Sequence, residues 1–264
     1  MLTCAAAEGP GALATWLPAA GLELDVLSLW AGGRVPERVD SDALVVLGGP
    51  QQAYDDRSAP WLRATKDLLR RAVADGLPVL AICLGAQLLA EATGGRVAPG
   101  PDGPELGARL VAKRDAAGND PLCWDLPLSP VVVQWHWDGV VDLPPGAVLL
   151  ASSPRFPHQA FRLGERAWGL QFHVEAPAEM VRGWAAEDEA LVRAAGLDPD
   201  LLVARTLLEL PEVEQVWRAV MERFAALAGG SGAPGPDGQG PDGQGPDGQG
   251  PDGQGPDGQG PDGR

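Results

Sequence analysis

Several features that mark common classes of protein are missing from this sequence. Its 264 residues include only three cysteines and three histidines, with no CxxC pair. This scarcity excludes a disulfide framework and a clustered Cys/His metal site, and neither a metal nor a cofactor is expected. The longest apolar runs, such as residues 78–82, fall far short of the ~20 residues that a membrane span needs. With a formal net charge of −16, the chain would repel phosphate backbones, which argues against a nucleic acid partner.

The N-terminal segment lacks a targeting pattern. Residues 1–10, MLTCAAAEGP, have neither the basic start nor the apolar stretch of a secretory signal, which predicts a cytoplasmic protein. Only residues 2–5 precede a turn-like segment, so little is left for a first strand. This shortness indicates that the natural start lies upstream.

The C-terminal segment has almost no apolar residues. From Pro236 onward it repeats PDGQG, and this period of five differs from the period of three that a collagen helix needs. Such a segment cannot bury a core and is expected to be disordered. We therefore predict one α/β domain over residues 1–228 and a disordered tail over residues 229–264.

Apolar runs and helical patterns alternate in the first part of the chain. Strands are expected at 24–29, 43–47 and 78–82, and helices at 11–20 and 61–74. This alternation predicts a parallel sheet covered by helices. Short strands with turns follow, for example at 131–135, 147–151 and 168–172. Two helices are expected near the end, at 178–190 and 212–227, with Pro177 and Pro211 in their first turns.

Cys83 lies between the apolar run PVLAI and the helical pattern LGAQLLAEA. This spacing is typical of a nucleophile elbow, a sharp strand-to-helix turn that exposes the nucleophile and needs small neighbours, here Ala81 and Gly85. The following helix would lower the thiol pKa, and the N–H of Leu84 would point at a developing oxyanion. The alternative is a buried structural cysteine, which is a common role for free cysteines.

His173 and Glu175 follow the strand-like run WGLQF. There His173 could accept the thiol proton and return it to a leaving amine, while Glu175 orients the imidazole. The turn at residues 48–50, GGP, follows another strand and brings bare backbone to the same edge, where an N–H could be a second oxyanion donor. A surface His-Glu pair and an ordinary turn are the structural alternatives.

Three motifs together resemble the class I glutamine amidotransferases: VLGGP at 46–50, PVLAICLGAQLLAEATGGRV at 78–97 and GLQFHVE at 169–175. The resemblance extends over residues 8–190, and QWHWD at 134–138 and HQAFRLG at 158–164 bring it closest to the stand-alone GMP-synthase-like domains. It implies a flavodoxin-like α/β fold, with a mostly parallel central sheet flanked by helices and a smaller antiparallel part.

The resemblance also implies roles for individual residues. Cys83 would attack the side-chain amide of glutamine, form a γ-glutamyl thioester and release ammonia, with His173 as base and Glu175 as its partner. The oxyanion hole and the substrate contacts are implied for the following residues: Gly49 and Leu84 for the oxyanion, Gln87, Trp135 and His136 for glutamine. Gln87 could instead be a helix residue facing solvent, and His136 could simply pair with Asp138; His158 is expected to be structural.

The sequence departs from the family pattern at a few positions. Ala81 stands where glycine is usual, Val174 where proline is common and Trp137 where glycine is usual. Ala81 and Val174 leave the motif geometry intact, whereas Trp137 could reshape the substrate mouth. Trp135 and Trp137 are the only tryptophans expected near the site, because burial in helices explains four of the others, Trp16, Trp61, Trp184 and Trp217.

Three functions remain open. A glutamine amidotransferase would need an ammonia-accepting synthase acting in trans, because the chain contains no such domain. A stand-alone hydrolase of γ-glutamyl peptides or conjugates would need only the same thioester and water. A non-catalytic regulatory module of the same fold is the third reading.

Overall fold

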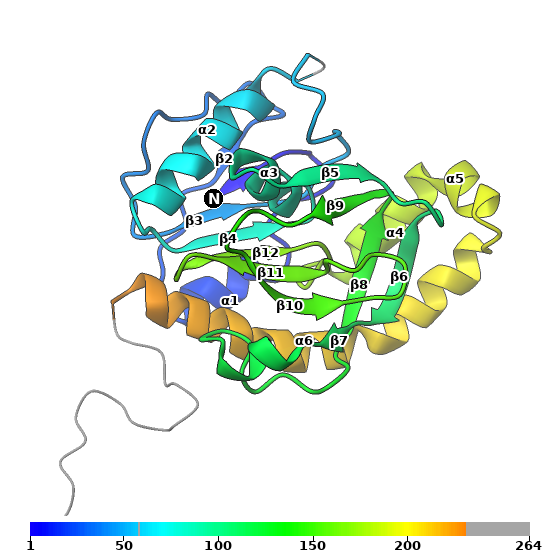
Figure 1. The fold of residues 1–264 in the computed structure, drawn as a ribbon. Coiled ribbons are helices and arrows are strands. Elements are labelled where there is room, and N and C mark those ends of the chain that lie inside the picture. Colours follow the sequence, from blue (N-terminus) through cyan, green and yellow to red (C-terminus); the bar gives the residue numbers. More distant parts are fainter. Residues whose placement is uncertain (58, 231–264) are drawn as a thin grey trace, which may run out of the picture.

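The computed structural model describes residues 1–57 and 59–230, which build a sheet between two layers of helices (Figure 1). The central sheet has eight strands in the order β2-β1-β3-β4-β12-β11-β10-β7. The first five pair in parallel, and the last three continue antiparallel. Their bounds are β1 (Leu2–Thr3), β2 (Leu27–Ser28), β3 (Leu44–Val46), β4 (Val79–Ile82), β7 (Ala112–Lys113), β10 (Val148–Ser152), β11 (Ala160–Leu163) and β12 (Ala167–Leu170). The predicted α/β class with a mostly parallel sheet is confirmed.

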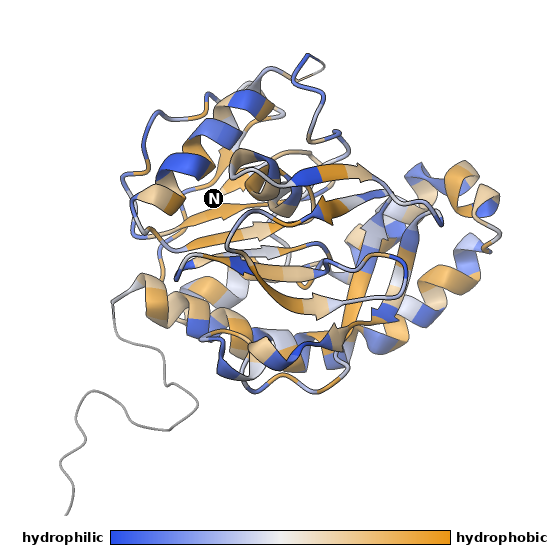
Figure 2. Ribbon diagram, in the orientation of Figure 1, coloured by the Kyte–Doolittle hydropathy of each residue, from blue (hydrophilic) through white to orange (hydrophobic). Residues whose placement is uncertain are grey.

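The central strands are apolar along their whole length because helices cover both faces of the sheet. All residues of β3, β4 and β12 are buried. One face packs against α2 (Trp61–Ala74) and α3 (Leu84–Ala92), and the other against α1 (Leu13–Ala19), α4 (Ala178–Glu187) and α6 (Pro199–Ala228). Figure 2 shows hydrophobic strands in the centre and hydrophilic turns on the outer side of α2. Two separate apolar cores therefore hold the sheet.

Two smaller antiparallel sheets lie beside the central one. In the first, β5 (Arg96–Pro99) pairs with β9 (Asp138–Asp142), and in the second, β6 (Glu105–Leu110) pairs with β8 (Val131–His136). The remaining elements are a 3-10 helix (Asp115–Asn119) and α5 (Glu189–Ala194). A backbone bridge joins Val133 of β8 to His173, just beyond the end of β12. The sheet of β6 and β8 therefore reaches the edge of the central sheet where the site is expected.

Three predicted elements differ from the structure. The strand predicted at 24–29 is only Leu27–Ser28, because its neighbour β1 offers two residues for pairing. The helix predicted at 178–190 is broken at Asp188 into α4 and α5. The helix predicted at 212–227 begins much earlier, at Pro199, so the placement of Pro211 in a first turn is wrong.

Local contacts explain the longer helix. The side chain of Asp198 caps the first turn of α6 by accepting a hydrogen bond from the N–H of Leu201 at 2.9 Å, and Pro199 fits the first turn because its missing N–H is not needed there. Pro211 removes one hydrogen bond from the helix interior. Val213 and Trp217, both buried, hold the helix on the core beyond that point.

The predicted tail falls outside the described residues, apart from Gly229 and Gly230. No helix within residues 1–57 and 59–230 is long and apolar enough to cross a membrane.

Candidate active site

Cys83 occupies a strained turn between β4 and α3. Its backbone has φ 52° and ψ −111°, and among the described non-glycine residues it alone has a positive φ. Its N–H donates to the carbonyl of Leu170 on the neighbouring strand at 2.8 Å, which fixes the turn against β12. A Cβ on Gly85 would lie 2.2 Å from the carbonyl oxygen of Val46, so this position needs glycine. These features are those of a nucleophile elbow.

His173 and Glu175 follow β12, which lies directly beside β4 in the sheet. The backbone of His173 exchanges two hydrogen bonds with Val133, at 2.8 and 3.1 Å. Its Nδ1 lies 2.7 Å from Oε1 of Glu175, and each side chain is only 1% exposed. The N–H of Val174 donates to Oε2 of Glu175 at 2.9 Å, a bond that a proline at this position could not make. Glu175 is thus held by two donors.

The imidazole of His173 lies close enough to the thiol of Cys83 for each group to shift the pKa of the other. Because Nδ1 is bonded to Glu175, Nε2 is the nitrogen that remains for the thiol. Burial lowers the pKa of His173, but Glu175 and Cys83 outweigh it and raise this pKa well above the ordinary value. The lower thiol pKa expected from the helix is not found: burial raises the pKa of Cys83 above its ordinary value, although His173 counteracts part of the rise. The histidine is therefore suited to hold a proton between a thiol and a carboxylate.

The glycine turn after β3 approaches the same cysteine. A Cβ on Gly48 would lie 3.3 Å from Cβ of Cys83, and one on Gly49 would lie 2.9 Å from Cβ of Cys4 and 3.1 Å from Cδ2 of Leu84. The turn can come this close only because it carries no side chains. Gly49 lines the cavity beside Cys83, and Leu84 is the first residue of α3.

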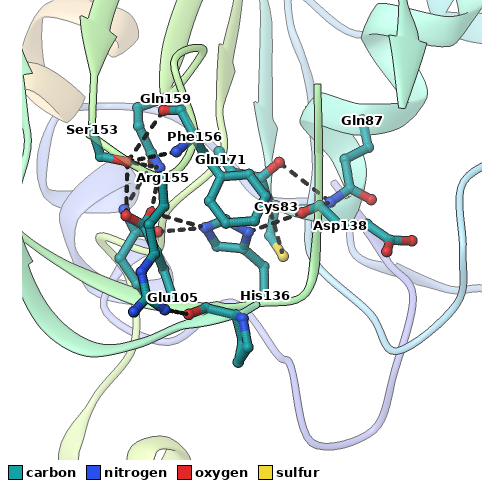
Figure 3. A network of polar contacts seen from close by, with 12 residues as sticks. Cys83, Gln87, Glu105, His136, Asp138, Ser153, Arg155, Phe156, Gln159 and Gln171 are labelled. Atoms are coloured by element: carbon teal, nitrogen blue, oxygen red, sulfur yellow. Dashed lines mark hydrogen bonds and ion pairs between the residues drawn. The ribbon is translucent and has the colours of Figure 1, made fainter. Parts of the chain in front are cut away.

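Gln87 is buried and faces the cavity, so the alternative of a solvent-facing helix residue is wrong. Its Nε2 donates to the carbonyl of Asp138 at 3.0 Å and to Oε1 of Gln171 at 3.2 Å. Nε2 of Gln171 in turn lies 4.0 Å from the sulfur of Cys83, and Figure 3 shows this chain of contacts. Both amide protons of Gln87 are used within the protein, so its Oε1 is the atom available to a substrate donor.

His136 lines the cavity, and its ring belongs to a polar network with Glu105 (Figure 3). Gln159 donates its Nε2 to Glu105 at 2.6 Å, so its Oε1 accepts from Gln134, whose own Oε1 lies 2.9 Å from Nε2 of His136. Nδ1 of His136 lies 2.9 Å from the carbonyl of Asp138. Both ring nitrogens of His136 therefore lie within hydrogen-bond distance of oxygen atoms of the protein, and Oε2 of Glu105 lies 3.6 Å from Nε2.

This network changes the expectation for His136. Burial raises the pKa of Glu105, but hydrogen bonds from His136, Ser153 and Gln159 outweigh it and hold the pKa below its usual value. Because both ring nitrogens of His136 have partners within the protein, a contact with glutamine would come from the chain around this residue, and that role stays a prediction. Among the described residues, His158 has no hydrogen bond to a group that lines the cavity. Its Nδ1 lies 2.9 Å from the carbonyl of Val140.

A cavity of about 600 Å³ opens beside Cys83. It is lined by backbone of the glycine turn, by aromatic rings and by carboxylates: Ala5, Ala6, Ala7, Glu8, Gly49, Pro50, Gln51, Gln52, Cys83, Gln87, Trp135, His136, Trp137, Asp138, Trp184, Glu187, Asp188 and Leu191. Trp184 was expected to be only a buried helix residue, and that expectation is wrong. Its ring lies 4.6 Å from that of His173 and stacks on Trp135 at 5.6 Å.

Glu8 is the functional candidate that the sequence alone did not reveal. Its Oε2 is buried without a hydrogen-bond partner. A Cβ on Gly48 would lie 2.1 Å from this oxygen and 3.0 Å from Cε1 of His173, so the carboxylate and the imidazole border the same small space. Gly11, with φ 52°, brings the turn so close to the backbone of Glu175 that a Cβ would lie 2.1 Å from its carbonyl oxygen. The sequence feature that could have indicated Glu8 is Gly11, because its close packing on Glu175 places the turn that contains Glu8 beside the end of β12.

Glu8→Gln is expected to change how stability depends on pH. Burial raises the pKa of Glu8 to about 7, with His173 opposing and Glu175 adding to the rise. The folded protein keeps the proton on Glu8 to a higher pH than the unfolded chain does. The contribution of this proton to the free energy of unfolding is therefore fully present below about pH 4.3 and is lost as the pH rises through the pKa of Glu8 in the folded protein.

Urea unfolding near pH 5 and near pH 8 checks this expectation. Between these values the wild type should lose on the order of 3 kcal/mol of unfolding free energy that the glutamine variant does not lose. Taking the difference between the two proteins removes the contribution of every other titrating group. Parallel pH dependences of the two proteins would contradict the placement of Glu8 in a desolvated site.

No group of three or more His, Cys, Asp or Glu side chains within the described ranges is arranged to hold a metal ion. At this edge the side chain of His173 is bonded to Glu175 and lies beside Cys83. Their arrangement fits covalent acyl transfer, with oxyanion donors from the backbone.

The comparisons with known proteins agree on one family. The family model described as glutamine amidotransferase class-I matches residues 17–180. The chain is 34% identical over 182 residues to the glutamine amidotransferase-like protein YfeJ of Salmonella typhimurium, covering 67% of this chain and 74% of that protein. A glutamine amidotransferase crystal structure from Thermotoga maritima superposes with a TM-score of 0.75 at 28% identity, covering 85% of this chain and 96% of that one.

Two further relatives have different names. Gamma-glutamyl peptidase 4 of Arabidopsis thaliana is 29% identical over 148 residues, which is 54% of this chain and 58% of that protein. The glutamine-hydrolysing GMP synthase of Porphyromonas gingivalis is 34% identical over 144 residues, which is 54% of this chain but only 26% of the synthase. The chain therefore matches about a quarter of the synthase.

Proposed function

Because the chain belongs to the class-I glutamine amidotransferase family, we propose that it hydrolyses a γ-glutamyl amide through a thioester on Cys83. The observation that carries this proposal is the meeting of three neighbouring strand ends. The glycine turn follows β3, Cys83 follows β4, and the hydrogen-bonded pair of His173 and Glu175 follows β12. These positions would supply an oxyanion site, a nucleophile and a base at one edge of the sheet.

In the proposed reaction, the reactive form is a Cys83 thiolate beside a His173 imidazolium. The sulfur attacks the γ-carbonyl carbon, and the N–H groups of Gly49 and Leu84 stabilise the oxyanion. When the C–N bond breaks, Nε2 of His173 donates its proton to the leaving amine. His173 then takes a proton from water, which attacks the thioester and releases glutamate. Glu175 keeps the imidazole oriented throughout and stabilises its charged form.

The leaving group distinguishes two candidates. Ammonia leaves if the substrate is glutamine, and an acceptor synthase acting in trans would then use it; similarity to part of the GMP synthases favours this reading. An amine leaves if the substrate is a larger γ-glutamyl amide. A cavity of about 600 Å³ has room for more than the side chain of glutamine, which favours hydrolysis of larger amides.

Product analysis with the purified protein tests the proposal. L-Glutamine, γ-glutamylalanine and γ-glutamyl-n-pentylamide are incubated separately with the protein, and glutamate, ammonia and free amine are quantified. The proposal requires glutamate in equal amount to ammonia or amine from at least one substrate. If none of them yields glutamate, while circular dichroism shows a folded protein, the proposal is wrong.

A further inference from the structure

The catalytic cavity is lined by four carboxylates and by no lysine or arginine in the described residues. The four are Glu8, Asp138, Glu187 and Asp188, and none of them takes part in an ion pair found in the described ranges. Two accept hydrogen bonds from neutral groups: Asp138 from the hydroxyl of Tyr54 at 3.1 Å and Asp188 from the indole N–H of Trp135 at 2.8 Å. The cavity lining therefore contains acidic side chains without a lysine or arginine partner.

Two basic side chains lie near this wall of the cavity, and each already has partners within the protein. Both ring nitrogens of His136 face oxygen atoms of the protein, and Oε2 of Glu105 lies 3.6 Å from Nε2. Arg155 lies in an adjoining hollow beyond Trp137, and its guanidinium donates to the carbonyl of Pro104 at 2.8 Å. Neither group neutralises the four carboxylates.

Aromatic rings complete the same cavity. Trp135 and Trp184 are stacked with their centroids 5.6 Å apart, and Trp137 lines the cavity beside them. Indole faces attract cations through the ring quadrupole, and a combination of indoles and carboxylates is suited to an alkylammonium group. The walls therefore favour a cation both by charge and by ring chemistry.

Glu8 places a carboxyl group where the leaving amine must lie. In the proposed reaction the amine receives its proton from His173, so it leaves beside the imidazole. Oε2 of Glu8 borders that space and has no protein donor. Burial raises the pKa of Glu8, and Glu187 and Asp188 add to the rise. A positively charged ligand would reduce the electrostatic repulsion among all of these carboxyl groups.

We propose that this cavity selects γ-glutamyl amides whose leaving amine carries a second, protonated nitrogen, such as the amides of diamines. The inference rests on the proposed γ-glutamyl hydrolysis. The γ-glutamyl head has one ammonium and one carboxylate, so glutamine has no net charge, a γ-glutamyl dipeptide is negative and a γ-glutamyl diamine is positive. Water adds across the amide bond, which yields glutamate and the free diamine.

Three amides with leaving groups of similar length test the inference. γ-Glutamyl-1,4-diaminobutane is positive, γ-glutamyl-n-pentylamide is neutral and γ-glutamyl-4-aminobutyrate is negative. We expect kcat/KM to fall in that order by about tenfold per step at low salt, and the spread to shrink at high ionic strength. Equal values, or the reverse order, would overturn the inference while leaving γ-glutamyl hydrolysis intact. No turnover of any amide or of glutamine would instead overturn the proposed function.

Substitutions of single carboxylates test which of them recognise the protonated amine. Glu187→Gln and Glu8→Gln should each lower the ratio of kcat/KM for the positive amide to that for the neutral amide by about threefold or more. Glu179→Gln removes one negative charge from the exposed first turn of α4 and does not touch the cavity, so the same ratio should stay within about twofold of wild type. An unchanged ratio in both cavity variants would show that these carboxylates do not recognise the amine.

Discussion

Replacement of Cys83 by alanine is expected to lower kcat for glutamate release by about 10⁴-fold or more. Without the sulfur no thioester can form, and the oxyanion donors and the histidine then have only a direct attack by water to assist. The fold should survive, because alanine fits the buried elbow. Steady-state assays with the best γ-glutamyl amide give kcat, and thermal unfolding shows whether the variant is folded.

Cys123 provides the matched control. It is also buried, at 2% exposure, but it lies outside the residues that line the cavity. Cys123→Ala should lose some stability and keep kcat within about twofold of wild type. If Cys83→Ala retained more than about a tenth of wild-type kcat, the assignment of Cys83 as the nucleophile would be wrong.

Glu175→Gln is expected to lower kcat by about 10²- to 10⁴-fold with a much smaller change in KM. Oε1 of Glu175 accepts from Nδ1 of His173, and Oε2 accepts from the N–H of Val174. A glutamine can present an oxygen to only one of these donors. With the amide oxygen held by Val174, the NH₂ group faces Nδ1 and drives the imidazole proton to Nε2, so the nitrogen facing Cys83 can no longer accept a proton.

Glu179→Gln, in the exposed first turn of the following helix, is the control for loss of one carboxylate near the site. It should leave kcat unchanged within about twofold. A kcat for Glu175→Gln within about threefold of wild type would show that the carboxylate does not determine which nitrogen of His173 carries the proton. The KM measured with both variants separates lost catalysis from lost binding.

The sequence predicted those parts of the fold that depend on local pattern. The buried runs that became β3 and β4 and the amphipathic stretch that became α2 were found because apolar spacing alone specifies them. The true start of α6 was missed although Asp198 and Pro199 form a capping signal. Pro211 was interpreted as the start of a helix because proline usually disfavours a helix interior. The helix continues past Pro211 because residues beyond it, such as Trp217, are buried in the core, and only the folded chain shows this burial.

The candidate site was predicted in part for the same reason. Cys83, His173 and Glu175 stand in recognisable motifs, and parallel strands bring their ends to one edge. Glu8 and Trp184 could not be found in this way. Glu8 reaches the site because Gly11 packs on the backbone of Glu175, and Trp184 because α4 folds back over His173. Gly11 and Glu175 are far apart in the sequence, as are Trp184 and its stacking partner Trp135, and no short motif specifies such a meeting.

The γ-glutamyl thioester gives the most direct test of the central claim. Wild-type protein is mixed with substrate, quenched in acid during turnover and digested, and the peptide containing Cys83 is weighed by mass spectrometry. We expect this peptide to gain the mass of one γ-glutamyl group, and the adduct to disappear when substrate is exhausted. An adduct on another residue, or single-turnover hydrolysis with no adduct at any time, would contradict a thioester at Cys83.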